Sequence, residues 1–121
     1  MGPSRAIILF GHGSRDPLWR QPMDAVAQRI RTLQPLLPVR CAFLELEIPD
    51  LDTAAGELVA LGALEVTIVP MFLGTGRHAR EDLPELVGRV RRSHPSVTFL
   101  LQAAVGEDRR LLDLLAKIAL A

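Results

Sequence analysis

Four short apolar runs alternate along this chain with four stretches of helical periodicity. This alternation predicts a parallel sheet covered by helices on both faces, because each parallel connection passes through a helical crossover. We therefore expect one α/β domain over residues 1–121, with a four-stranded parallel sheet in the order β-α-β-α-β-α-β-α. The runs predicted as strands are residues 6–10, 39–44, 64–73 and 97–101.

The first and third runs are almost entirely apolar, which is typical of central strands buried on both sides. Helical spacing is clearest in the stretch after the first run, where apolar residues recur three or four positions apart. These residues are Met23, Val26, Ile30 and Leu33. We expect Asp50 to cap the second helix and Gly62 to end it.

The last two helices are predicted from similar patterns. Gly106 is expected to open the final helix, with Leu111, Leu115 and Ile118 along one side. The third helix should end near residues 93–95. Its predicted inner face consists of Leu83, Leu86, Val87 and Val90.

The composition excludes several classes of function. Fourteen basic residues balance fourteen acidic ones, and aromatic residues are few, so neither a nucleic-acid-binding charge nor a base-stacking platform is expected. The single cysteine, Cys41, rules out an internal disulfide or a paired-cysteine metal site. No stretch has the length of a membrane span or the form of a signal peptide, so we expect a cytoplasmic protein.

Three ionisable residues follow three of the predicted strands. His12 follows the first, Glu45 closes the second, and His78 lies in the loop after the third. The carboxyl ends of parallel strands form one edge of a sheet, where ligands bind. Two imidazoles and a carboxylate on that edge suit divalent-metal binding or proton transfer. Glycines beside both histidines allow a ligand to approach the backbone closely.

Glu47 competes with Glu45 for the acidic role. The two residues are two apart, so in an extended chain their side chains point the same way. We prefer Glu45 because it lies closer to the end of the strand.

Basic and hydroxyl side chains in the same loops are candidates for binding carboxylates. They are Ser14, Arg15, Arg77 and Arg80. A guanidinium group binds a carboxylate through two parallel hydrogen bonds, so this edge suits a ligand that carries several carboxylates. The alternative is that the arginines only solubilise the surface.

Two further residues are expected to be structural. Trp19 should pack at the start of the first helix, with a wall for a flat ligand as the alternative. His94 should lie at the end of the third helix, away from the proposed edge.

Three separated motifs, in order, resemble the CbiX/SirB sirohydrochlorin chelatases. They are Ile8–Arg15, Phe43–Glu45 with the following Pro49, and Val69–His78 with the following Asp82-Leu83-Pro84. The resemblance covers nearly the whole chain and implies the class II chelatase fold.

The resemblance also implies insertion of Co²⁺ or Fe²⁺ into sirohydrochlorin, a carboxylate-rich tetrapyrrole, on the way to cobalamin or sirohaem. It places His12 and His78 at metal-binding positions and Glu45 at an acidic one. It implies that the short form acts as a homodimer and needs no cofactor beyond its substrate metal, Co²⁺, Fe²⁺ or Ni²⁺. The sequence alone does not choose between these metals, because imidazole accepts all three.

Two rival functions were considered. A carrier that binds the metal or the tetrapyrrole without turnover would need the same His12, Glu45 and His78. A histidine phosphatase also has a histidine after its first strand, but it needs an arginine directly before that histidine to hold phosphate. Gly11 occupies that position here, which disfavours the phosphatase.

Overall fold

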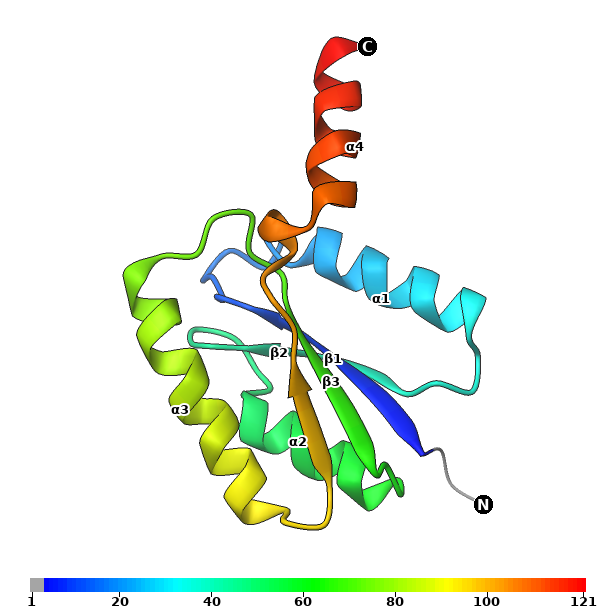
Figure 1. The fold of residues 1–121 in the computed structure, drawn as a ribbon, viewed down its shortest axis with the longest axis vertical. Helices are drawn as coiled ribbons and strands as arrows, with labels where there is room; N and C mark the ends of the chain where they lie inside the picture. The colour runs from blue at the N-terminus through cyan, green and yellow to red at the C-terminus, as the bar shows by residue number, and fades with distance from the viewer. Residues whose placement is uncertain (1–3) are drawn as a thin grey trace.

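A four-stranded parallel sheet organises residues 4–121, the part of the chain that the computed structural model describes (Figure 1). The strand order is β2-β1-β3-β4, so the two most apolar runs form the central strands, as predicted. Residues 1–3 of the predicted domain lie outside the described part. The strands are β1 (Arg5–Gly11), β2 (Val39–Phe43), β3 (Glu65–Pro70) and β4 (Thr98–Leu101).

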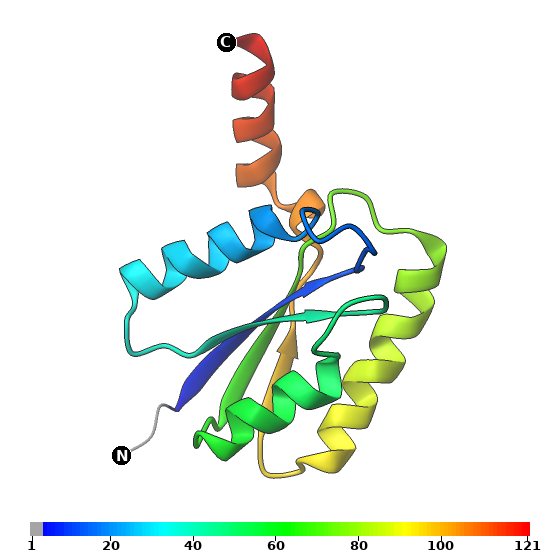
Figure 2. The same ribbon diagram turned by 180° about the vertical axis from the view of Figure 1, so that it is seen from behind.

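Helices lie on both faces of the sheet, which confirms the predicted α/β class. Figures 1 and 2 show α1 on one face and α2 with α3 on the other. The last helix, α4, follows a short 3-10 turn, η1, and points away from the sheet. The bounds are α1 (Gln21–Leu33), α2 (Leu51–Ala60), α3 (Arg77–Ser93), η1 (Val105–Glu107) and α4 (Arg109–Leu120).

Each face of the sheet has its own hydrophobic cluster. The larger cluster lies under α2 and α3 and includes Ile8, Phe10 and Leu58, all fully buried. The smaller cluster lies under α1 and includes Leu9 and Phe43. Alternate residues of β1 serve opposite faces, as the two-residue period of a strand requires.

The predicted helix signals are largely correct. The Asp50 carboxylate accepts a hydrogen bond from the Thr53 backbone N–H at 2.9 Å, which caps α2. Gly62 has φ +99° just after the helix, a conformation that favours glycine. Leu33 is the exception on α1: it is 78% exposed, because it lies in the last turn beyond the edge of the cluster.

The predicted start of the last helix is wrong. Gly106 lies in η1, and α4 begins at Arg109, where the Asp108 carboxylate accepts a hydrogen bond from the Arg110 backbone N–H at 2.8 Å. The predicted apolar side of this helix exists, but none of its residues is buried against residues 4–121.

No helix among residues 4–121 is long and apolar enough to cross a membrane.

The Asp50 cap makes the stability of α2 depend on pH. The hydrogen bond from Thr53 holds the pKa of the Asp50 carboxyl below its usual value. Because the folded-state pKa is the lower one, the stabilisation is present above pH about 4 and is lost as the pH falls further.

We expect Asp50→Ala to lower the free energy of unfolding by about 1 kcal/mol at pH 7, measured by urea denaturation. The loss should shrink as the pH falls below about 4. Asp50→Asn serves as the control, because its amide oxygen accepts the same bond at every pH. An equal loss for Asp50→Ala at pH 7 and pH 2 would contradict this role.

Candidate functional site

The structure brings His12 and Glu45 into direct contact. Their loops leave the neighbouring strands β1 and β2, and the backbone pairing continues past the strand ends. The Leu44 N–H donates to the Gly11 carbonyl at 2.9 Å, and the Glu45 N–H donates to the His12 carbonyl at 3.1 Å. The His12 Nε2 atom therefore lies 3.0 Å from Glu45 Oε1, with the two side chains 45% and 48% exposed. This pair is open to a ligand.

Gly13 allows the two loops to approach this closely. It has φ +101°, and a Cβ at this position would lie 1.7 Å from the Glu45 carbonyl oxygen. No side chain fits in that space. The glycine after His12 is therefore required by the contact between the loops.

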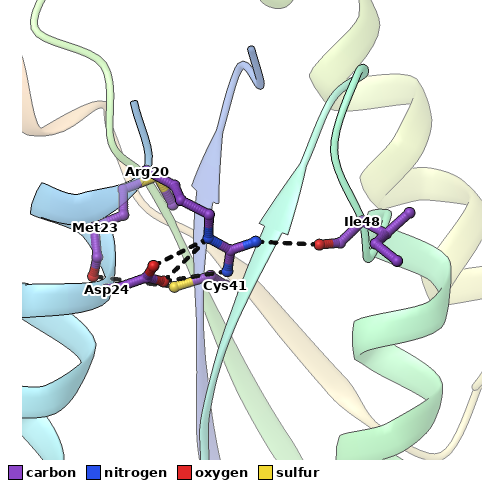
Figure 3. Close-up of polar contacts among 5 residues, drawn as sticks. All are labelled: Arg20, Met23, Asp24, Cys41 and Ile48. Atoms are coloured by element: carbon purple, nitrogen blue, oxygen red, sulfur yellow. Dashed lines mark hydrogen bonds and ion pairs between the residues drawn. The ribbon is translucent and has the colours of Figure 1, made fainter. Parts of the chain in front are cut away.

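Arg20 holds the segment that carries Glu45. Figure 3 shows its guanidinium group between the carboxylate of Asp24 and the backbone carbonyl of Ile48. The Arg20 Nε lies 3.0 Å from Asp24 Oδ2, and Nη1 donates to the Ile48 carbonyl at 3.4 Å. The same guanidinium stacks over the Phe43 ring at 4.6 Å. Its hydrogen bond to Asp24 raises the pKa of Arg20. Helix α1 is thus tied to the bend after β2.

Glu45 and Glu47 do not lie side by side. The chain bends after β2, with Leu46 at φ +67°, so the extended geometry considered for the two acids does not apply. Glu47 Oε2 is buried and has no hydrogen-bond partner among residues 4–121. Both acids line a cavity of about 810 Å³, which Arg20 and Arg40 also line. Only Glu45 is paired with His12.

His78 is placed differently from the prediction. It lies in the first turn of α3, and its Nε2 atom is 2.9 Å from Asp82 Oδ2, one turn further along the helix. Its side chain is 70% exposed. Within residues 4–121, no three histidine, cysteine or acidic residues lie close enough to hold a metal ion. The structure therefore unites His12 with Glu45 and leaves His78 in a separate pair.

No role was predicted for Asp82 from the sequence, although it lies beside His78. The signal was present in the sequence, since residues four apart on a helix face each other. A carboxylate bonded to an imidazole fixes the orientation of the ring and makes its other nitrogen a better ligand or base. His12 has such a hydrogen-bonded partner in Glu45, and the His78 Nε2 atom lies at ion-pair distance from Asp82 Oδ2.

The predicted carboxylate-binding residues are in place at the surface, with some local partners. Ser14 Oγ accepts a hydrogen bond from the Asp16 N–H at 3.0 Å, which shapes the loop. Arg77 Nε is 3.0 Å from Glu81 Oε1, and Arg80 Nη1 donates to the Thr75 carbonyl at 2.9 Å. Arg15 is exposed. The binding roles of all four stay predictions.

A second cavity, of about 540 Å³, lies at the carboxyl ends of β3 and β4. It is lined by Arg80, Thr75 and Gln102 among apolar residues of α3 and the loop after β3. The cavity beside Glu45 instead extends along the outer strand β2, since Arg40 of that strand and Glu57 of α2 also line it.

The two residues predicted to be structural pack as expected. The Trp19 ring meets the Phe43 ring edge-on at 6.1 Å, although 40% of the residue is exposed. His94 caps the end of α3, and its ring lies 6.2 Å from that of Phe99. Burial raises the pKa of the Cys41 thiol, which agrees with a packing role.

Comparison with known proteins matches residues 6–119 to the model of the CbiX family. The sirohydrochlorin ferrochelatase of Bacillus subtilis is 32% identical over 107 residues, which is 88% of this chain and 41% of that protein. A crystal structure from Marinobacter aquaeolei VT8, described as a putative CbiX protein of cobalamin (vitamin B12) biosynthesis, superposes with a TM-score of 0.81 and 32% identity. It covers 95% of this chain and 93% of that one.

The sirohydrochlorin chelatase SirB from Bacillus subtilis subspecies spizizenii, solved with cobalt, superposes with a TM-score of 0.80 and 28% identity. This match covers 95% of the present chain and 49% of SirB. The chain therefore spans less than half the length of both Bacillus proteins.

The contact between the two loops is open to a direct test. We expect Gly13→Ala to lower the free energy of unfolding by about 1–3 kcal/mol, because the new Cβ meets the Glu45 carbonyl and the backbone is left-handed there. Gly74→Ala is the matched control, since a Cβ at that position meets nothing within 4 Å. Chemical denaturation of both variants measures the difference, and equal stability would contradict the close approach.

Proposed function

Because this chain belongs to the CbiX family, we propose that it inserts a divalent metal, Co²⁺ or Fe²⁺, into sirohydrochlorin. The observation that carries the proposal is the exposed His12–Glu45 pair at the carboxyl edge of the sheet. The names of two relatives, a sirohydrochlorin ferrochelatase and a sirohydrochlorin chelatase solved with cobalt, support the substrate and the choice of metals.

The proposed reaction replaces two pyrrole protons of the macrocycle by one metal ion. The metal ion and the free macrocycle enter, and the metallated macrocycle and two protons leave. An imidazole suits this exchange, because it binds borderline divalent metals and also accepts protons. In our proposal His12 receives a proton or holds the metal at its ring, while Glu45 orients that ring and stabilises its positive charge.

We propose that His78 acts from the neighbouring loop as a second metal or proton site, oriented by Asp82. In each pair an exposed imidazole lies beside a carboxylate, at 3.0 Å for His12–Glu45 and 2.9 Å for His78–Asp82. Their loops follow β1 and β3, which are neighbours in the sheet, so both lie at one edge. A macrocycle is broad enough to reach both loops.

The peripheral carboxylates of the substrate are proposed to bind Arg15, Arg77 and Arg80, with Ser14 beside them. Arg15 lies in the loop that carries His12, and Arg77 and Arg80 lie with His78 in the first turn of α3. Exposed pairs such as Arg77–Glu81 contribute little stability, so a substrate carboxylate can replace the glutamate at small cost. We also propose a cytoplasmic location.

We also propose that the active form is a homodimer. The chain spans about half the length of SirB, so two copies supply the amount of structure that SirB has in a single chain.

Metal insertion in variants of the histidines tests the assignment. We expect His12→Ala and His78→Ala each to lower the rate of cobalt insertion into sirohydrochlorin by about a hundredfold or more, followed by absorbance. His94→Ala is the control, because this histidine lies at the other end of α3. Near-normal rates in both site variants, or a spectral change that only matches the amount of protein added, would favour a carrier instead.

A matched pair of variants distinguishes the roles of Glu45 and Glu47. Glu45→Gln should slow insertion by at least about tenfold, because it weakens the support of the His12 ring. Glu47→Gln should leave the rate close to that of the unchanged protein. The opposite ranking would transfer the acidic role to Glu47.

A further inference from the structure

Exposed apolar side chains gather in the loops at the edge of the sheet that carries the proposed site. These loops follow β1, β2 and β3, which are neighbours in the sheet, so they lie together at its carboxyl edge. Single exposed apolar side chains are ordinary on a protein surface, but a group of them at one edge indicates a binding surface. The members, called the apolar rim below, are Leu18 and Trp19 after β1, Leu46 and Ile48 after β2, and Leu73 after β3.

Leu46 combines a strained backbone with an exposed position. It has φ +67° and is the only residue other than glycine with a positive φ among residues 4–121. The left-handed backbone is unfavourable for leucine, whereas glycine and asparagine adopt it more readily. Leu46 is also 53% exposed, so contacts within the chain cover only part of it. Strain of this kind is typical of positions where a side chain serves a site.

The apolar rim adjoins the His12–Glu45 pair on both loops. Leu46 follows Glu45 directly, and Glu45 Oε1 lies 3.0 Å from His12 Nε2. Trp19 lies against Gly11, the residue before His12, since a Cβ on Gly11 would be 3.2 Å from Trp19 Cη2. Trp19 is partly exposed, so it is also open to a ligand. A ligand that reaches the pair is therefore within reach of apolar side chains.

Backbone hydrogen bonds fix the segment that carries Leu46. On one side of this residue, the Glu45 N–H donates to the His12 carbonyl at 3.1 Å. The Phe43 N–H donates to the Pro49 carbonyl at 3.0 Å and closes the bend at its base. A side chain on an anchored segment loses less conformational freedom when it contacts a ligand, so more of the contact contributes to affinity.

We propose that Leu46 and Trp19 contact one face of the macrocycle and hold it beside His12. The identity of the macrocycle rests on the function proposed above. A tetrapyrrole has a flat, largely apolar ring with its carboxylates at the periphery, and this edge of the sheet offers groups that suit both parts. Apolar side chains lie next to the histidine, and arginines such as Arg15 are available for the carboxylates.

Contact between the ring and the apolar rim also removes water from the site. Charges interact more strongly where water is excluded, so the Glu45 carboxylate then better supports a positive charge on His12. The rim thus has two effects in this proposal: it increases the affinity for the ring, and it strengthens the electrostatic support of the imidazole. The alternative occupant of the rim is a second copy of this chain, and the test separates the two.

The first experiment measures the binding of metal-free sirohydrochlorin through quenching of Trp19, the only tryptophan of the chain. We expect Leu46→Asn to raise the Kd about tenfold, because it removes apolar contact with the ring. Leu46→Met keeps an apolar side chain and should bind several-fold more tightly than Leu46→Asn. Leu36→Asn is the matched control, because Leu36 is 91% exposed and lies in the loop before β2, at the opposite edge of the sheet.

Stability and kinetics separate this role from a purely structural one. Asparagine accepts the left-handed backbone, so Leu46→Asn should unfold at the same or a higher urea concentration than the unchanged protein. In the insertion assay this variant should raise the KM for sirohydrochlorin about tenfold and leave the KM for Co²⁺ unchanged. Lower stability together with weaker binding would mean that Leu46 serves the fold and not the ring, which overturns the proposal.

The outcomes also separate this inference from the proposed function. If the unchanged protein does not bind sirohydrochlorin, both are wrong. If the unchanged protein binds it and inserts the metal, and Leu46→Asn has the same Kd, only the role of the apolar rim is wrong. A changed solution mass of Leu46→Asn, measured by light scattering, together with an unchanged Kd would assign the rim to a contact between copies and also overturn the proposal.

Discussion

The backbone pairing of β1 with β2 is the constraint on which the site depends. It continues beyond both strands, as far as His12 and Glu45, and so places an imidazole against a carboxylate. Gly13 makes the approach sterically possible, and Arg20 holds the far side of the bend. The geometry of the pair therefore follows from the pairing of the two strands.

Much of the fold follows from local patterns in the sequence. The apolar runs identified the central strands because parallel strands are buried on both faces, and Asp50 and Gly62 marked the ends of α2 through cap chemistry that needs no tertiary information. The start of α4 was predicted wrongly because it depends on a tertiary contact. Gly106 is required by its close approach to Leu73, a contact between segments that local periodicity does not contain.

The site was predictable in part. The carboxyl edge of a parallel sheet collects the residues that follow its strands, so His12 and Glu45 were correctly expected to share one edge. The His78–Asp82 pair received no role from the sequence, although its spacing was visible. The preference for Glu45 over Glu47 agrees with the structure, but the extended geometry considered for the two acids fails because the chain bends at Leu46. A positive φ at a leucine has no local signal that predicts it.

The uncovered apolar face of helix α4 connects the folding of this segment to the concentration of the protein. If its apolar face is completed only by another molecule, the order of residues 109–120 is governed by mass action, as ligand binding is. Dilution then frees the helix, which exposes its apolar side chains. The concentration of the protein would then set the fraction of molecules in which the apolar side chains of α4 are buried.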